Sequence, residues 1–336
     1  MTLWLVRAGE HGDQEQGALD NKIITIGWNE LPNLSAIQNK EELEELYVKT
    51  YGSEKKMRIV NRVGQIWSFL KKIKVGDLVA LPLKTQSAIA IGEVTGDYKY
   101  KEYSSNIKHT RSVNWQKIIP RSEFDQDILF SLGAFLTVGQ VRRENAEERV
   151  RKLLEGDVRP KVVLGLSEDE IEEPSSLDLE QIAKDQLIKY LEAKFSGHSL
   201  ARLVDEILHV QGYITKVSPP GADGGVDILA GSGPLGFDDP KICVQVKSSK
   251  SPVDVRVLRE LEGVAKNFRA DYGILVAWGG LTKIADQEIG RSFFSTRLWD
   301  QGKIVDEVLK HYEKFSDKLK AEFPLKRIWT IVEESE

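Results

Sequence analysis

The chain has 336 residues, a formal net charge of −5 and a single cysteine, and this length predicts two domains rather than one. The acidic balance excludes a protein that coats nucleic acid with a broad basic face, although it leaves room for a local basic groove. Without a membrane-length apolar run, a signal-peptide pattern or a partner for Cys243, we expect a cytoplasmic protein with no membrane contact and no internal disulfide.

The N-terminal half predicts short strands around one or two helices. The expected strands cover residues 2–8, 22–28, 78–82, 88–94 and 111–115. Helical spacing of apolar residues covers residues 40–51 and 54–71, and residues 122–154 read as a loop and a charged helix. This pattern predicts a small mixed β-barrel, and we expect the first domain to span residues 1–155.

Residues 156–180 combine glycine, proline and a run of acidic residues, so we expect an interdomain linker there. The second domain, residues 181–336, alternates helices and strands. The helices are expected at residues 177–195, 200–209, 254–268 and 282–291 and from 302 onward, and the later strands at 272–278 and 296–300. This order predicts an α/β core with a mixed sheet.

The chemistry of the second domain gathers around a glycine-rich turn and two strands. Asp227 ends the turn and opens an apolar strand, and the next strand carries Gln245 and Lys247. Alternate residues of a strand share a face, so Gln245 and Lys247 project together, and pairing of the two strands brings Asp227 beside them. A carboxylate, an amide and a lysine in one place suit metal-assisted attack of water on a phosphodiester. Asp223, earlier in the turn, is equally compatible with a turn residue.

These residues resemble a known family. Gly212-Tyr213, the run Asp223-Gly-Gly-Val-Asp227 and Gln245-Val-Lys247 are similar to the catalytic domain of Mrr-like restriction endonucleases, in the Gln-x-Lys branch of the PD-(D/E)xK superfamily. The resemblance covers roughly residues 195–300 and implies a restriction-endonuclease-like α/β core. It departs from the family at Leu200-Ala201, where the family often has Phe-Glu.

The resemblance also implies roles. Asp227 is the expected metal-binding aspartate, Gln245 stands where the wider superfamily has an acid, and Lys247 is expected to orient the attacking water. Glu206 matches the family's helix acid, although a solvated helix position is its alternative, and its neighbour Asp205 is expected to face solvent.

Oxygen ligands suit Mg²⁺, and Asp227, Gln245, the Val246 carbonyl and Glu206 could supply them. Gln245 removes one negative charge, which predicts weaker metal binding. We name Ser248 and Arg256 as candidate phosphate contacts. The alternative for Ser248 is a capping residue, and the alternative for Arg256 is a position on a solvated helix face.

The N-terminal half carries a second, weaker resemblance. Its anchors, Trp4 to Gly9, Gly27-Trp28, Gly76-Asp77 and Gly96-Asp97-Tyr98, are similar to the PUA/EVE superfamily of small barrels, which bind RNA or read modified DNA bases. The resemblance implies a pocket for a flipped base, lined by aromatic rings. The candidate pocket residues are Arg7, Trp28, Trp67, Tyr98 and Tyr100. For Trp67, packing in the core is a stronger interpretation than a place in the pocket. For Trp28 the two interpretations are equal.

Together these patterns predict a Mg²⁺-dependent DNA endonuclease, acting as a modification-dependent (type IV-like) restriction enzyme in defence against foreign DNA. Double-stranded DNA, modified or not, is the expected partner, and a homodimer is expected because two strands need two active sites. Three alternatives stay open. The nuclease fold could bind nucleic acid without cutting it, a nucleotide bound to residues 1–155 could switch the nuclease on, or the target could be RNA.

Overall fold

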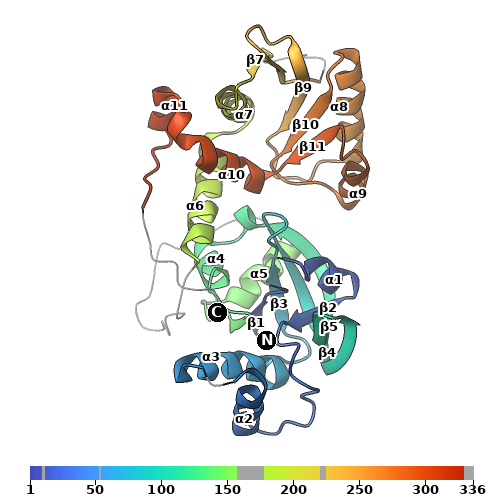
Figure 1. Ribbon diagram of the computed structural model, residues 1–336, viewed down its shortest axis with the longest axis vertical. Helices are drawn as coiled ribbons and strands as arrows, with labels where there is room; N and C mark the ends of the chain where they lie inside the picture. Colours follow the sequence, from blue (N-terminus) through green and yellow to red (C-terminus); the bar gives the residue numbers. More distant parts are fainter. Residues whose placement is uncertain (10–11, 53, 157–177, 220–224, 329–336) are drawn as a thin grey trace. The chain divides into compact units, whose positions relative to one another are not determined.

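The computed structural model describes residues 1–9, 12–52, 54–156, 178–219 and 225–328. The chain divides into two compact units, one formed by the described residues up to Ile182 and one by those from Ala183 onward (Figure 1). Most of the expected linker, and Asp223, lie outside the described residues. None of the helices in the described ranges is long and apolar enough to cross a membrane.

The first unit is built on one mixed sheet of six strands in the order β2-β5-β4-β3-β1-β6. The β1 and β3 strands pair in parallel, and the other neighbours pair antiparallel. The strands are β1 (Leu3–Val6), β2 (Ile23–Ile26), β3 (Leu78–Pro82), β4 (Ala88–Ser104), β5 (Ile107–Pro120) and β6 (Val138–Gln140).

Helices cover both faces of this sheet. They are α1 (Glu15–Asp20), α2 (Lys40–Tyr51), α3 (Lys56–Trp67), α4 (Gln126–Leu132) and α5 (Ala146–Glu155), with a π-helical turn at Ser68–Lys72 and a 3₁₀ turn at Arg121–Glu123. Trp4 and Val6 pack with α2 and α3, whereas Leu3 and Leu5 pack with α4 and α5. Because alternate residues of β1 thus serve opposite cores, the sheet is a central layer.

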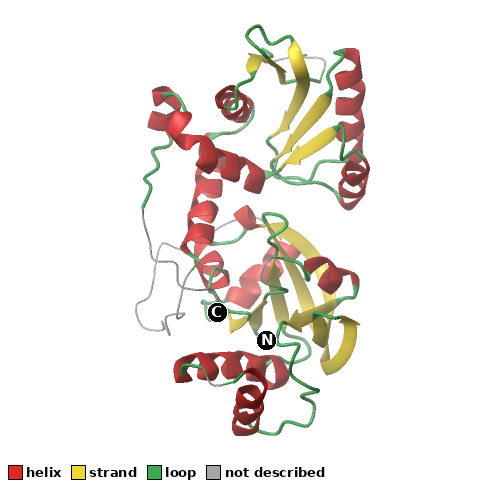
Figure 2. Ribbon diagram, viewed as in Figure 1, coloured by secondary structure: helices red, strands yellow, loops and turns green. Residues whose placement is uncertain are grey.

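The expected barrel is therefore not supported. The end strands β2 and β6 each pair with one neighbour only among the described strands, so the sheet stays open (Figure 2). Its two apolar faces are buried against helices instead of enclosing one interior. The strand expected at residues 88–94 is also longer in the structure, because a register shift between Val94 and Tyr98 absorbs Gly96 and Asp97 as a bulge and β4 continues through them.

The second unit contains a five-stranded mixed sheet in the order β11-β10-β9-β8-β7. The β9, β10 and β11 strands run parallel, and β7 and β8 are antiparallel to their neighbours, which confirms the mixed sheet expected for this half. The strands are β7 (Ile214–Val217), β8 (Ile228–Ser232), β9 (Asp238–Lys247), β10 (Tyr272–Ala277) and β11 (Thr296–Trp299).

Two helical layers enclose this sheet (Figure 1). One apolar cluster joins Val244 and Ile228 to α6, α7 and α10, and the other joins Cys243 and Leu275 to α8. The thiol of Cys243 is fully buried, and burial raises its pKa to about 11. The helices are α6 (Leu179–Lys194), α7 (His198–Val210), α8 (Val255–Asn267), α9 (Lys283–Arg291), α10 (Gln301–His311) and α11 (Asp317–Glu322), with a 3₁₀ turn at Tyr312–Lys314.

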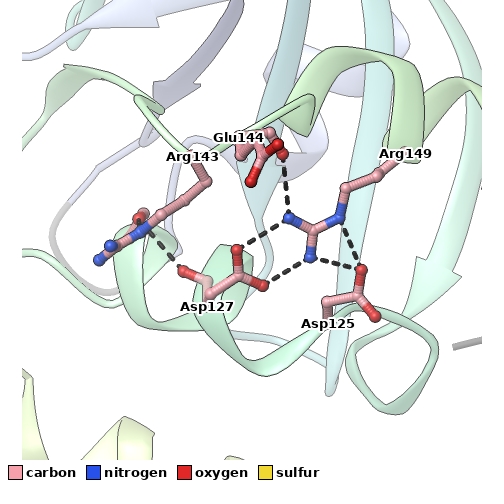
Figure 3. Close-up of polar contacts among 6 residues, drawn as sticks. Asp125, Asp127, Arg143, Glu144 and Arg149 are labelled. Atoms are coloured by element: carbon pink, nitrogen blue, oxygen red, sulfur yellow. Dashed lines mark hydrogen bonds and ion pairs between the residues drawn. The ribbon is translucent and has the colours of Figure 1, made fainter. Parts of the chain in front are cut away.

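A charged cluster in the first unit joins α5 to the start of α4 (Figure 3). Arg149 on α5 donates 2.8 Å hydrogen bonds to Asp125, the N-cap residue of α4, and to Asp127 in its first turn. Burial raises the pKa of the Asp127 carboxyl, but the hydrogen bonds and charge of Arg149 outweigh it and lower that pKa below its ordinary 3.8. The hydrogen bond with Asp127 is the main cause that raises the pKa of Arg149.

We predict that Arg149→Met lowers the free energy of unfolding by roughly 1–3 kcal/mol, because it leaves two partly buried carboxylates facing each other without a cation. The measurement is calorimetric unfolding of the full chain. The matched control is Lys152→Met, which removes an exposed i,i+4 ion pair with Glu148 on the same helix and should change stability by less than about 0.5 kcal/mol.

The same cluster predicts a pH dependence. A carboxyl whose pKa is lowered by folding stabilises the fold fully above its unfolded value, here 3.8, and loses that contribution as the pH falls through the folded value. The stability difference between the parent and Arg149→Met should therefore be constant near neutral pH and shrink in the acid range, as the pH falls toward the lowered pKa of Asp127 in the folded parent. A difference that stays the same down to pH 2 would show that Asp127 does not carry it.

Candidate active site

Asp227 stands at the point where the pairing of β8 with β9 ends. Its backbone N–H donates to the carbonyl of Val244 at 2.9 Å, as a strand residue would. Its carboxylate Oδ2 then accepts the N–H of Val246 at 2.7 Å. The side chain of Asp227 thus replaces the next backbone acceptor of the ladder, and this hydrogen bond holds the half-buried carboxylate against β9.

Gln245 lies on the same face of β9 as Cys243, the face covered by α8. It is 4% exposed, and its Oε1 has no hydrogen-bond partner within the described residues. A buried amide oxygen without a partner is costly, so this oxygen is available to a hydrogen-bond donor or a cation. Next to it, Gly225 has a φ of +86°, a conformation that favours glycine, and the turn there approaches Gln245 closely.

Lys247 ends β9, two residues beyond Gln245 and on the same face. Its carbonyl accepts the N–H of Trp278 at 2.9 Å, which fixes the backbone to the end of β10. Its half-buried ammonium has no hydrogen bond or ion pair with any other described residue. The side chain lines a pocket of about 410 Å³ at the end of the strand, together with Ser248, Ser249, Ser251 and Asp254.

The loop that follows Lys247 is held on two sides. The Oγ of Ser248 accepts the N–H of Gly197 at 2.9 Å, and Lys250 forms an ion pair with Glu192 on α6. At Gly279 a Cβ would lie 2.3 Å from the carbonyl oxygen of Lys250, so only glycine permits this approach of the two chain segments. These contacts position the end of β9, and the pair Gly279-Gly280 after an apolar strand is the sequence signal that could have revealed them.

The structure does not bring Glu206 to this group. The Oε1 of Glu206, on α7, accepts the N–H of Ser316 at 2.8 Å, and Ser316 is the N-cap residue of α11. The apolar face of α7 packs against the sheet face that carries Val244, opposite Gln245. Among the described residues no three His, Cys, Asp or Glu side chains gather as a metal site.

A divalent cation nevertheless fits the remaining oxygen atoms. The Asp227 carboxylate and the unpartnered Gln245 Oε1 are hard ligands. The N–H of Val246 points toward Asp227, and within a strand the N–H and C=O of one residue point to the same side, so the Val246 carbonyl faces the same place. This donor set carries one formal negative charge, and weak metal binding remains a prediction.

In the first unit, three of the predicted aromatic residues border the same apolar core. Trp28, Trp67 and Tyr98 are half-buried and pack against one apolar cluster. Sequence reasoning missed His109, whose Nδ1 lies 2.8 Å from the hydroxyl of Tyr98 and whose ring contacts that of Tyr100 at a centroid distance of 5.2 Å. No local motif marks this histidine, which enters the group through its register opposite Tyr100 on the neighbouring strand.

His109 is fully buried, and burial is the main cause that lowers its pKa to about 4, against the backbone carbonyls of Leu31 and Trp28, which raise it. Burial likewise raises the pKa of Tyr98 to about 12. Both side chains are therefore neutral near pH 7.

The two predicted arginines are engaged within the chain. Arg7 donates from Nη2 to the carbonyls of Leu132 and Ala134, at 2.9 and 3.0 Å, and burial lowers its pKa. Arg256 lies in the first turn of α8, where it is exposed and paired with Asp254 at 3.4 Å. Arg7 thus secures the end of α4, whereas Arg256 remains accessible.

Comparison with known families finds two matches. Residues 192–308 match a family described as restriction endonuclease, and residues 4–129 match a domain of unknown function (DUF8426). The second match takes the place of the expected PUA/EVE-like domain, which is not confirmed. No curated protein matches the chain.

Similar solved structures include the MspJI restriction endonuclease in complex with a 27-mer oligonucleotide, at 16% identity and a TM-score of 0.31, covering 96% of this chain and 80% of that one. They also include the DNA modification-dependent restriction endonuclease AspBHI, at 15% identity and a TM-score of 0.32, covering 76% of this chain and 70% of that one. Both TM-scores are too low to support an argument about this chain. The match of residues 192–308 by itself supports a nuclease role for the second unit.

Proposed function

We propose that the chain is a metal-dependent DNA endonuclease whose active site is formed by Asp227, Gln245 and Lys247. The observation that carries this proposal is the buried Oε1 of Gln245, which has no hydrogen-bond partner among the described residues. It lies on the strand that holds the Asp227 carboxylate and that ends at Lys247, whose ammonium has no ion pair within the same described ranges. The oxygen atoms of this set can bind a cation, and the ammonium of Lys247 can bind an anion. A phosphodiester with its counter-cation supplies both.

Each residue then has a defined task. Asp227 and Gln245, with the Val246 carbonyl, would hold the cation, for which we propose Mg²⁺; when bound, it would stabilise the charge that develops on the phosphate. Lys247 Nζ would donate a hydrogen bond to the attacking water or to a phosphate oxygen, and its backbone bond to Trp278 keeps it in place. The serines beside Lys247 would offer further donors to the phosphate.

We further propose that the first unit selects the DNA, with modified bases as its targets, and that the enzyme acts in the cytoplasm against foreign DNA. The neutral aromatic group of Trp28, Tyr98, Tyr100 and His109 supports this, because stacking and uncharged hydrogen bonds suit a base better than a phosphate. Cleavage of both strands would require two copies of the chain on one duplex.

A nuclease fold that only binds DNA is the second candidate, and Gln245 favours it. Among the proposed ligands Asp227 is the single carboxylate, and Glu206, which could have added another, accepts a hydrogen bond from Ser316 at the start of α11 instead. Such a protein would bind duplex DNA equally well with and without a divalent cation.

We predict that the purified chain cuts duplex DNA in the presence of Mg²⁺, that a chelator abolishes cutting, and that Asp227→Ala and Lys247→Ala each lower the rate at least about a hundredfold. The measurement is a cleavage time course on a panel of duplexes with and without modified bases. Arg259→Ala, an exposed change on α8, is the matched control. Equal cutting by the parent and both site variants would refute the assignment.

Changes at Gln245 test its assignment as a metal ligand. Gln245→Met keeps the length of the side chain but removes the amide oxygen, so we expect a loss of cleavage of about tenfold or more. Gln245→Glu adds a carboxylate to the site, so half-maximal cleavage should need several-fold less Mg²⁺. A Mg²⁺ titration of the cleavage rate measures both. An unchanged Mg²⁺ requirement in both variants would show that Gln245 is not a ligand.

A further inference from the structure

The outer half of the β4–β5 pair forms a two-stranded ribbon. The inner half of the β4–β5 pair has strands on both sides. The β3 strand pairs with β4 only as far as Glu93, and β2 pairs with β5 only from His109 onward. Residues 98–109, which we call the ribbon, make up this outer part, where β4 pairs with β5 from Tyr98 opposite Arg111 to Ser104 opposite Ile107. Among the described strands no third strand covers the outer edge of β4 along this stretch.

The ribbon is braced at its tip. Asn29 donates to the carbonyl of Asn106 at 2.9 Å, and Asn106 donates to Asp13 at 3.0 Å. Ile107 is buried, and Tyr103 packs with it against α1. The ribbon therefore offers a preformed surface, which a partner can bind without first ordering it.

Charge on the ribbon runs against that of the chain. It carries Lys99, Lys101 and Lys108 against one acid, Glu102, in a protein with a net charge of −5. None of the three ammonium groups has an ion-pair partner among the described residues. Asp97, at the base of the ribbon, is paired with Arg111 at 3.4 Å. The ammonium of Lys101 lies over the ring of Tyr103, 4.5 Å from its centroid. A local excess of lysines on an acidic protein favours a polyanion as the partner of this surface.

The arrangement of these residues fits DNA. Lys99 and Lys101 are exposed, and the register places Lys99 opposite Thr110, so Lys99 and Lys108 share one face of the ribbon. The ring of Tyr100, 39% exposed, lies on the other face against His109. A two-stranded ribbon has the width that the major groove of B-DNA admits, with lysines reaching the phosphates on either side.

We propose that the ribbon of residues 98–109 is a contact surface for the phosphate backbone of double-stranded DNA, and that Lys99, Lys101 and Lys108 make the contacts. This inference rests on the proposed function only in its choice of DNA as the polyanion. It assigns a role to lysines that lie far along the chain from Asp227, Gln245 and Lys247.

The test compares two triple variants of the full chain, each in a Lys247→Ala background so that bound DNA is not cut. The ribbon variant carries Lys99→Gln, Lys101→Gln and Lys108→Gln. The control carries Lys40→Gln, Lys49→Gln and Lys56→Gln, the same charge change on exposed positions of α2 and α3. Thermal unfolding of both confirms that they fold. Binding of a fluorescent duplex is measured by anisotropy over a series of salt concentrations.

We expect the ribbon variant to bind the duplex at least about fivefold more weakly at low salt, and its salt dependence to flatten by about 0.9 in log–log slope for each lysine that contacts a phosphate. The control should match the parent. Equal affinity and slope in the two variants, or no duplex binding by the parent, overturns the proposal. Tighter binding of an RNA of the same sequence, lost equally in the ribbon variant, overturns double-stranded DNA as the partner.

The outcome is separable from that of the proposed function. If the parent chain with Lys247 does not cut any duplex but the ribbon variant still loses affinity, the nuclease proposal fails and the ribbon proposal holds. If the parent cuts and the ribbon variant binds as the control does, the reverse is true.

Discussion

The hydrogen bond from the N–H of Val246 to the carboxylate of Asp227 is the constraint on which the proposed active site depends. A strand that loses its neighbour leaves backbone groups without partners, and such groups must find another acceptor or face water. Here the side chain of Asp227 supplies the acceptor. One carboxylate oxygen is thereby committed to the fold, and the arrangement places the carboxylate beside Gln245 instead of in open solvent.

The rest of the second unit supports this strand end from both sides. The parallel neighbour β10 holds the carbonyl of Lys247 through Trp278, and the close approach at Gly279 presses the following loop against the end of that strand. On the far side, Glu192 and Gly197 bind Lys250 and Ser248. A side chain proposed to act on a phosphate is thus attached to a backbone that has little freedom to move, as positioning for catalysis requires.

Sequence reasoning placed Gln245 and Lys247 correctly on one strand, and Asp227 correctly at the start of another, because strand geometry is local. The two-residue spacing of Gln245 and Lys247 places them on one face in any register, and the motif before Ile228 puts Asp227 at the start of a strand. The position of Glu206 depends on which sheet face receives α7 and on the arrival of α11, and neither is encoded near that residue. Whether the two end strands of the first sheet pair with each other likewise depends on packing far from them in sequence. Helices cover both faces of that sheet, so it stays open instead of closing into the predicted barrel.

The lone cysteine has a practical consequence. Cys243, on β9, is fully buried between the sheet and α8. Its raised pKa keeps the thiol protonated at neutral pH, and a protonated thiol reacts slowly because the thiolate is the reactive form. The native chain is therefore close to inert toward maleimides while it stays folded. In the folded chain, a cysteine introduced on any exposed loop would be the one that reacts with a spectroscopic probe, so Cys243 need not be removed first. Unfolding would expose Cys243, and its labelling would then report loss of the fold.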